Sequence, residues 1–246
     1  MENNNIWEYK FKVRSFDVDK NKSITLTSIS EYLQEVAGDH ANSMGFGYRQ
    51  LVLQDMVWIL SGIKIEVERF PLWEEEIRIE TWIVGNDKFL SRRDFEWYDS
   101  KGNLIIKAST NWILFNTATR RPQLVERMEF PVEMYPNKVA TTSPISNIRS
   151  KFDDDNPYEY KVRYTDLDMI GHMNNTKYIQ LLMNYYGEEF QKTKKFYSID
   201  INFKTEAKLN DALLLNSNTI DKNTTYHELK KAADSKVNCL YIVICK

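Results

Sequence analysis

Cysteine is scarce in this chain, and the two cysteines present cannot pair with each other. Cys239 and Cys245 lie six residues apart in one predicted strand of the 246-residue sequence, on one face but too distant along it for a disulfide bond. We expect reduced core thiols, as in a cytoplasmic protein. Two cysteines and three scattered histidines do not supply a zinc site, so we expect neither a metal nor another cofactor.

An excess of one charge and a long apolar run are also missing. The formal net charge is -2, whereas nucleic-acid-binding proteins usually carry a basic excess. No stretch reaches the ~18 apolar residues that a membrane-spanning helix needs. The first ten residues, MENNNIWEYK, lack a basic start followed by an apolar run, so we expect no signal or transit peptide. These absences predict a cytoplasmic protein without a nucleic-acid or membrane partner, and they are compatible with a monomer or a homodimer.

Proline is rare except in one stretch. Of six prolines in the chain, all but Pro71 fall between residues 117 and 157. Because proline cannot donate a hydrogen bond inside a sheet, a stretch this rich in proline cannot form central strands. Residues 118–157 are therefore predicted to form an extended linker over the surface of the fold.

Hydrophobic periodicity predicts the elements on either side of this linker. Apolar and polar residues alternate over 7–16, 57–70, 75–84, 89–98 and 104–115, as in half-buried strands. Apolar residues spaced three and four apart predict a helix over 28–43, with Thr25 or Thr27 as its N-cap. The connections between the later strands are too short for crossover helices, so the sheet is predicted to be antiparallel.

The second half of the chain repeats the first. Asp17 and Asp19 recur as Asp166 and Asp168 at an offset of 149 residues, and the strand pattern around Ile63 recurs around Ile199 at an offset of 136. The copy predicts a helix over 175–190 and strands over 196–206, 211–220, 224–233 and 236–245. We expect an α+β protein built from an N-terminal unit, 1–117, the linker 118–157, and a C-terminal unit, 158–246.

The segment from Arg163 to Tyr178 is the strongest candidate site. His172 follows Asp168 by four residues and precedes a predicted helix start near Asn175. An acid that orients an imidazole, next to unpaired backbone N–H groups, is a plausible catalytic arrangement, although a lone histidine is more often structural. Under the two offsets, His172 falls opposite Ser23 and Glu206 opposite Phe70. This asymmetry favours one catalytic copy, while a solvated surface glutamate remains the alternative interpretation of Glu206.

The pattern Asp-Leu-Asp-x-x-x-His-x-Asn-Asn-x-x-Tyr from Asp166 to Tyr178 resembles the active-site segment of the acyl-ACP thioesterases. Segments 30–47, 58–73, 92–99 and 119–122 resemble the first half of the same family in the same order. The resemblance implies a tandem double hot-dog, in which two antiparallel sheets each wrap round a long helix. It also implies hydrolysis of fatty acyl-ACP to free fatty acid, with acyl carrier protein (ACP) as partner. The N-terminal unit would bind the acyl chain and the C-terminal unit would be catalytic.

By this resemblance the catalytic residues are Asp168, His172 and Glu206. Either Glu206 or His172 would activate water, and Asp168 would fix the imidazole. Asn174 and Asn175 would support the site, with backbone N–H groups of 174–177 as oxyanion donors.

Two positions depart from the family pattern. Ile170 stands where the family usually has a catalytic asparagine, and Ala207 stands where plant members carry a cysteine. The first departure leaves an alternative function open, a non-catalytic or weakly active protein that binds acyl-ACP or acyl-CoA.

The resemblance further implies a tunnel for the acyl chain in the first half. Met56, Trp58 and Trp112 are the candidates for its walls, although ordinary core packing is the simpler interpretation of such residues. Docking of the acidic carrier would need a local basic patch. The available clusters are Arg92-Arg93, Arg120-Arg121 and the lysines Lys192, Lys194 and Lys195.

Overall fold

The computed structural model describes residues 6–127, 133–149, 156–193 and 196–245, without the side chains of 189–193. The chain divides into two compact units, Met1–Pro144 and Ile145–Lys246. Their boundary falls inside the stretch for which the sequence predicts a linker. No helix in the described part of the chain has the length and apolarity to cross a membrane.

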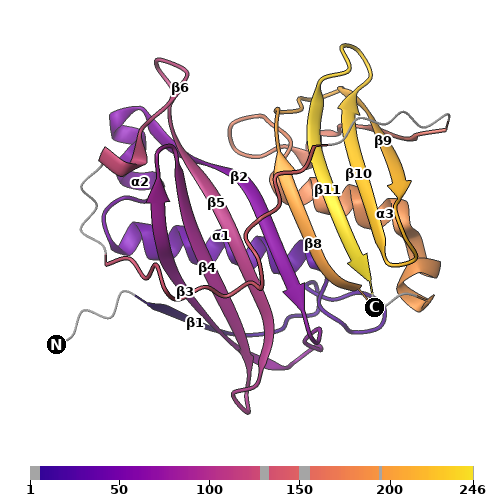
Figure 1. The fold of residues 1–246 in the computed structure, drawn as a ribbon, viewed down its shortest axis with the longest axis horizontal. Coiled ribbons are helices and arrows are strands. Elements are labelled where there is room, and N and C mark those ends of the chain that lie inside the picture. The colour runs from indigo at the N-terminus through magenta and orange to yellow at the C-terminus, as the bar shows by residue number, and fades with distance from the viewer. Residues whose placement is uncertain (1–5, 128–132, 150–155, 194–195, 246) are drawn as a thin grey trace. The chain divides into compact units, whose positions relative to one another are not determined.

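The first unit is an antiparallel sheet with one long helix, α1 (Leu26–Ser43) (Figure 1). The strands follow the order β1-β3-β4-β5-β2, and a short strand, β6, pairs with β5. In the sequence, α2 (Tyr48–Leu51) and the 3-10 turn η1 (Val52–Gln54) lie between α1 and β2, in a stretch for which no helix was predicted. A second 3-10 turn, η2, spans Val125–Arg127. The strands are β1 (Trp7–Lys12), β2 (Met56–Val67), β3 (Glu76–Asp87), β4 (Leu90–Asp99), β5 (Leu104–Asn116) and β6 (Arg121–Pro122).

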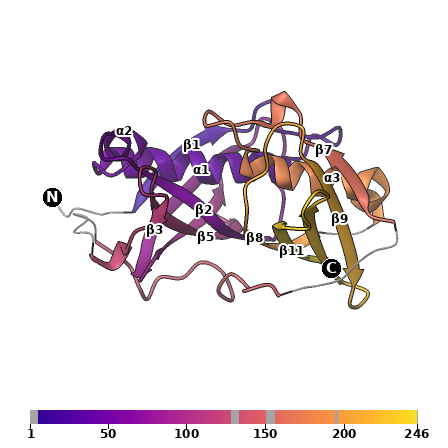
Figure 2. The ribbon, with the colours of Figure 1, turned by 90° about the horizontal axis from the view of Figure 1, so that it is seen from above.

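Helix α1 forms where the sequence predicts it. The side chain of Thr25 accepts the N–H of Ser28 at 3.0 Å and so caps the helix start. Ile29, Leu33 and Val36 lie on one face and are fully buried. Figure 2 shows α1 on one side of the strands of the first unit and the linker on the other. The apolar face of the helix and the inner face of the sheet therefore make the core of this unit.

The second unit repeats this plan around α3 (Asn175–Thr193). Its strand order is β8-β11-β10-β9-β7, and all pairings are antiparallel. Gly187, with φ +64°, interrupts the helical backbone within α3. The strands and turn are β7 (Tyr158–Lys161), the 3-10 turn η3 (Tyr164–Asp166), β8 (Phe196–Phe203), β9 (Ala212–Thr219), β10 (Thr224–Lys231) and β11 (Val237–Cys245). The predicted α+β class with two sheet-and-helix units is confirmed.

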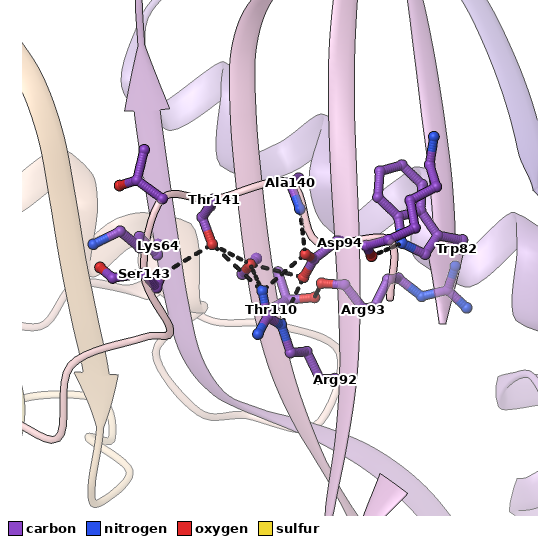
Figure 3. Close-up of polar contacts among 12 residues, drawn as sticks. Lys64, Trp82, Arg92, Arg93, Asp94, Thr110, Ala140, Thr141 and Ser143 are labelled. Carbon is purple, nitrogen blue, oxygen red and sulfur yellow. Dashed lines mark hydrogen bonds and ion pairs between the residues drawn. The ribbon is translucent and has the colours of Figure 1, made fainter. Parts of the chain in front are cut away.

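Buried acids on the outer face of the first sheet hold the linker. The N–H of Ala140 donates to Asp94 at 2.8 Å, and the N–H of Thr142 donates to Glu66 at 3.1 Å. Both carboxylates are buried, Asp94 on β4 and Glu66 on β2. Figure 3 shows Asp94 between the linker backbone and Arg92, which binds it at 2.8 Å. Residues 140–142 of the linker therefore lie against the outer face of this sheet.

Candidate active site

A closed loop leads into α3 and carries three of the predicted site residues, Asp168, His172 and Asn174. The carboxylate of Asp166 accepts the backbone N–H of Arg163 and the hydroxyl of Tyr160, both at 2.7 Å. The N–H of Asn174 donates to the carbonyl of Asp166 at 2.8 Å, so the two ends of the loop meet. These bonds close the loop of residues 167–173 before the helix begins.

Asp168 orders this loop through the main chain. Its Oδ1 accepts the backbone N–H groups of Ile170 and His172, each at 3.0 Å. The N–H of Asp168 donates to the carbonyl of His172 at 2.8 Å, and Gly171 takes a φ of +85°, which favours glycine. Asp168 therefore positions His172 by its backbone, whereas the family resemblance implied that the acid fixes the imidazole.

His172 and Glu206 come together although they are far apart in sequence. His172 forms an antiparallel bridge with Lys208, and the N–H of Met173 donates to the carbonyl of Ala207 at 2.8 Å. This pairing brings the segment after β8 against the loop. Nε2 of His172 lies 3.2 Å from Oε2 of Glu206, with side-chain exposures of 23% and 49%. The two groups interact directly, and both are open to solvent.

Tyr178 supports the segment that carries Glu206. Its buried hydroxyl accepts the N–H of Ala207 at 3.2 Å. Burial raises the pKa of Tyr178, so the hydroxyl stays neutral at physiological pH. The contact ties this segment to α3, because Tyr178 lies in the first turn of that helix.

The start of α3 leaves one candidate oxyanion donor. The side chain of Asn174 accepts the N–H and the hydroxyl of Thr176, at 2.9 and 3.0 Å, and so caps the helix. The N–H groups of Asn174, Thr176 and Lys177 are all bonded within the protein. In the described part of the chain, the N–H of Asn175 has no protein acceptor. Of the four N–H groups predicted as oxyanion donors, that of Asn175 is therefore the one left to bind an oxyanion.

The first unit contains the same loop without the reactive groups. Oδ1 of Asp19 accepts the N–H groups of Asn21 and Ser23, at 2.8 and 3.1 Å. Ser23 bridges to Leu72 as His172 bridges to Lys208. The geometry thus aligns Ser23 with His172, and Phe70 with Glu206, as the two sequence offsets indicate. The loop skeleton alone needs neither a histidine nor a glutamate.

The first unit has a pocket of about 190 Å³ between α1 and the sheet. Trp58 and Trp112, two of the three residues proposed for the walls of an acyl tunnel, are in its lining. Met56 is not among the described residues that line it, and packs instead against the cluster of Leu51, Leu114 and Val125. The lining also includes Gln34, Ala37, Gly38, Ala41, Phe46, Gly47, Tyr48, Ile83, Ser91 and Arg93.

Arg93 is the charged residue of this pocket, and it is buried. Its Nη1 lies 2.7 Å from Nδ1 of His40 and donates to Oγ1 of Thr81 at 3.2 Å. Burial lowers the pKa of Arg93 to about 9, which leaves it charged at neutral pH. Burial, and then the charge of Arg93, lowers the pKa of His40 to about 3, so its imidazole is neutral. Since arginine only donates, Nδ1 of His40 is the acceptor.

Two family descriptions match successive parts of the chain. Residues 4–131 match the acyl-ACP thioesterase N-terminal domain, and residues 149–242 match the acyl-ACP thioesterase C-terminal domain. The chain belongs to the acyl-ACP thioesterase family. The family resemblance of the motif around His172 is thereby confirmed.

Plant members of the acyl-ACP thioesterase family are similar over most of this chain. Oleoyl-acyl carrier protein thioesterase 1 of Arabidopsis thaliana is 31% identical over 225 residues, covering 84% of this chain and 62% of its own length. The oleoyl-acyl carrier protein thioesterase of Coriandrum sativum is 30% identical over 240 residues, covering 89% and 64%. The chain therefore spans less than two thirds of these chloroplastic relatives.

Solved structures of the family share the fold. An acyl-ACP thioesterase from Bacteroides thetaiotaomicron superposes with a TM-score of 0.90 at 26% identity, covering 99% of this chain and 98% of its own. The 12:0-ACP thioesterase from Umbellularia californica gives a TM-score of 0.85 at 21% identity, covering 98% and 97%. The predicted hot-dog fold is confirmed.

The two departures from the thioesterase pattern have clear structural settings. Ile170 lies at the tip of the loop, 60% exposed, and its side chain can neither donate nor accept a hydrogen bond. Ala207 is fully buried next to Glu206, so a cysteine acyl-enzyme at this position is excluded. The free cysteines, Cys239 and Cys245, are buried in β11.

The predicted basic clusters have different outcomes. Arg92 binds the buried carboxylate of Asp94, and Arg93 is itself buried. The prediction that this pair could form a docking patch for an acidic carrier is therefore wrong. Arg120 and Arg121 are exposed. The lysine cluster lies outside the described residues, since the structure describes neither Lys194, Lys195 nor the side chain of Lys192.

Sequence reasoning missed the polar part of the pocket. Strand alternation offered a signal, because it places Arg93 on the same face of β4 as the core residue Phe95. Gly38 offered another, since a glycine inside a helix costs about 1 kcal/mol relative to alanine and, without a side chain, leaves space beside the helix. Among the described residues, no cluster of three or more metal-ligating side chains occurs.

Proposed function

We propose that this protein hydrolyses the thioester of fatty acyl-ACP with the Glu206 and His172 pair of the second unit. The observation that carries the proposal is the 3.2 Å approach of Nε2 of His172 to Oε2 of Glu206, in a chain of the acyl-ACP thioesterase family. The first unit lacks this pair at the equivalent positions, which supports a single catalytic centre in the chain.

In the proposed reaction, Glu206 takes a proton from water as the water oxygen attacks the thioester carbon. A positioned base of this kind typically contributes about 10²- to 10⁴-fold. The carbonyl oxygen becomes an oxyanion; it then reforms the carbonyl and expels the thiolate of the carrier. Glu206 passes the proton that it took from water to Nε2 of His172, 3.2 Å away, and His172 passes it on to the thiolate. The products are a carboxylic acid and free thiol.

The oxyanion needs hydrogen-bond donors, and we assign the N–H of Asn175 to this role. It lies in the first turn of α3, where the partial positive charge of the helix dipole also stabilises an anion. Asn174 caps the helix and so keeps this N–H in place. Asp168 holds the backbone of His172.

The acyl chain would be bound in the first unit, in the pocket lined by Trp58 and Trp112. The lining is largely apolar, as expected for a site that holds a hydrocarbon chain. The carrier would be ACP, the partner named for the plant relatives.

The direct test measures thiol released from acyl-ACP by the purified chain and by two variants. Glu206→Gln keeps the size of the side chain but cannot accept a proton, so turnover should fall ~10²-fold or more. His172→Gln keeps a hydrogen-bond donor near Glu206 but cannot pass a proton to the thiolate, so its turnover should fall as well. Ser23→Ala, at the matched position of the first unit, is the control and should keep full turnover. Unchanged release by Glu206→Gln would defeat the assignment of the base.

Ile170 favours a second candidate function, an acyl-ACP or acyl-CoA binding protein of little or no activity. A single oxyanion donor is worth about 10²- to 10³-fold in turnover, and isoleucine supplies none. This candidate predicts saturable binding of acyl-ACP without thiol release, and a gain of activity in Ile170→Asn. Thiol release by the unmodified chain at a rate that Ile170→Asn does not raise would eliminate it.

A further inference from the structure

The pocket of the first unit contains a buried cation with one unused edge. Arg93 is 4% exposed and lies in the lining of the cavity. Its guanidinium has five N–H donors. The two on Nη1 are directed at Nδ1 of His40 and Oγ1 of Thr81. The structure gives the Nε and Nη2 groups no acceptor among the described residues, and these groups form the edge that binds a carboxylate side-on.

No negative charge among the described side chains compensates this cation. His40, its nearest partner, is held neutral. The adjacent acid, Asp94, leaves β4 on the opposite face and binds Arg92 and the linker. Figure 3 shows the side chain of Arg93 extending away from the carboxylate of Asp94. Because an unpaired buried charge is costly, the free edge of Arg93 is a strong site for an anion.

The other walls of the pocket are mainly apolar. Phe46, Trp58, Ile83 and Trp112 contribute large apolar or aromatic surfaces, and Ser91 adds a hydroxyl on the same face of β4 as Arg93. The cavity of about 190 Å³ compares with the ~150 Å³ that holds a benzene molecule. It therefore has room for roughly six to eight non-hydrogen atoms, and because the pocket is open on one side, the end of a longer chain can extend out of it. One cation in an apolar cavity of this size fits a small amphipathic anion.

We propose that this pocket binds a free monocarboxylic acid, with the carboxylate on the Nε and Nη2 edge of Arg93 and the hydrocarbon chain against Trp58 and Trp112. The two N–H groups of that edge match the two carboxylate oxygens in a bidentate contact. Ser91 can donate a further hydrogen bond to the same carboxylate.

This site extends the proposed function, because the proposed hydrolysis releases acids of this class. The released acid would compete with the acyl chain for the pocket and so inhibit further turnover. Binding of the acid needs no catalysis, so the two proposals can fail separately. Thiol release tests the first, and a binding titration without acyl-ACP tests the second.

The experiment is isothermal titration calorimetry of the full chain with sodium octanoate and, as the neutral ligand of equal carbon number, 1-octanol. Octanoate should bind at least ~10-fold more tightly than octanol, a difference of ~1.4 kcal/mol, because only octanoate pairs with the guanidinium. Equal affinities, or no binding of octanoate, would overturn the proposal.

Three variants make the test specific. Arg93→Gln removes the charge and should weaken octanoate binding ~10-fold or more while leaving octanol binding unchanged. Arg49→Gln is the matched control, because it removes an exposed charge beside Tyr48 of the lining and should bind as the unmodified chain does. Octanoate binding retained by Arg93→Gln would refute the assignment. If Arg93→Gln does not fold, Gly38→Leu tests the site instead, because its side chain fills the pocket. Octanoate binding that is undiminished in Gly38→Leu would refute the site.

Discussion

The role assigned to Asp168 can be tested against a matched residue in the same chain. Asp168 and Asp19 occupy equivalent loops, and the Oδ1 of each accepts two backbone N–H groups. If Asp168 only positions the backbone of His172, its removal should cost the same stability as removal of Asp19. Only the loss of Asp168 should affect catalysis, because only that loop carries a histidine.

The magnitudes follow from the two hydrogen bonds. Each contributes about 0.5–1.5 kcal/mol net, so Asp19→Ala and Asp168→Ala should each lower the free energy of unfolding by about 1–3 kcal/mol. A displacement of His172 by about 1 Å can reduce turnover on the order of 10²-fold. We therefore expect thiol release by Asp168→Ala to fall by about this factor, and Asp19→Ala to keep its turnover.

Asparagine variants separate positioning from charge. Asp168→Asn keeps an Oδ1 acceptor for Ile170 and His172 but removes the negative charge. We expect Asp168→Asn to recover most of the stability and turnover lost in Asp168→Ala, as measured by urea unfolding and thiol release from acyl-ACP. If Asp168→Asn is as inactive as Asp168→Ala while Asp19→Asn is fully stable, the charge of Asp168 acts in the chemistry and the positioning role is refuted.

Two further predictions concern the pocket and the pH dependence of stability. A Cβ placed on Gly38 meets no atom within 4 Å, so a larger side chain there would project into the pocket. Gly38→Leu should lower the turnover of long-chain relative to short-chain acyl-ACP ~10-fold or more. Gly38→Ala is the control: it should stabilise α1 by up to ~1 kcal/mol and leave the chain-length preference unchanged. An unchanged chain preference in Gly38→Leu would exclude the pocket as the acyl site. Burial lowers the pKa of His227 to about 3, so unfolding takes up a proton below pH 6.5, and stability should fall with decreasing pH between about 6.5 and 3. In His227→Gln, the free energy of unfolding measured with urea should depend less steeply on pH, by up to ~1.4 kcal/mol per pH unit. If the variant and the unmodified chain have the same pH dependence, His227 is charged in the folded protein.

Most elements of both units could be predicted from the sequence because their patterns are local. The apolar stripe of α1 and its N-cap at Thr25 appear at the predicted places. The loop that holds His172 is also local, since every hydrogen bond made by Asp168 is to a residue within four positions. The helix α2, only four residues long, was not predicted, because one turn is too short to show a hydrophobic period.

The basic pair Arg92-Arg93 shows where local reasoning failed. The sequence shows two adjacent cations and suggests a solvated surface, yet one binds Asp94 under the linker and the other enters the pocket. Adjacent residues in a strand point to opposite faces, and burial of each face depends on what packs against it. In this unit the linker covers one face of β4 and α1 covers the other.

The sequence by itself determined the two repeated units, their strands and helices, and the loop that presents His172, because each depends on interactions between near neighbours in the chain. Only the tertiary structure decided that Glu206, 34 residues beyond His172, lies 3.2 Å from it. That distance depends on the bridge between His172 and Lys208, which forms only when the segment after β8 packs against the loop. The environment of Arg93 is likewise a tertiary property, since His40 and Thr81 reach it from a helix and a neighbouring strand.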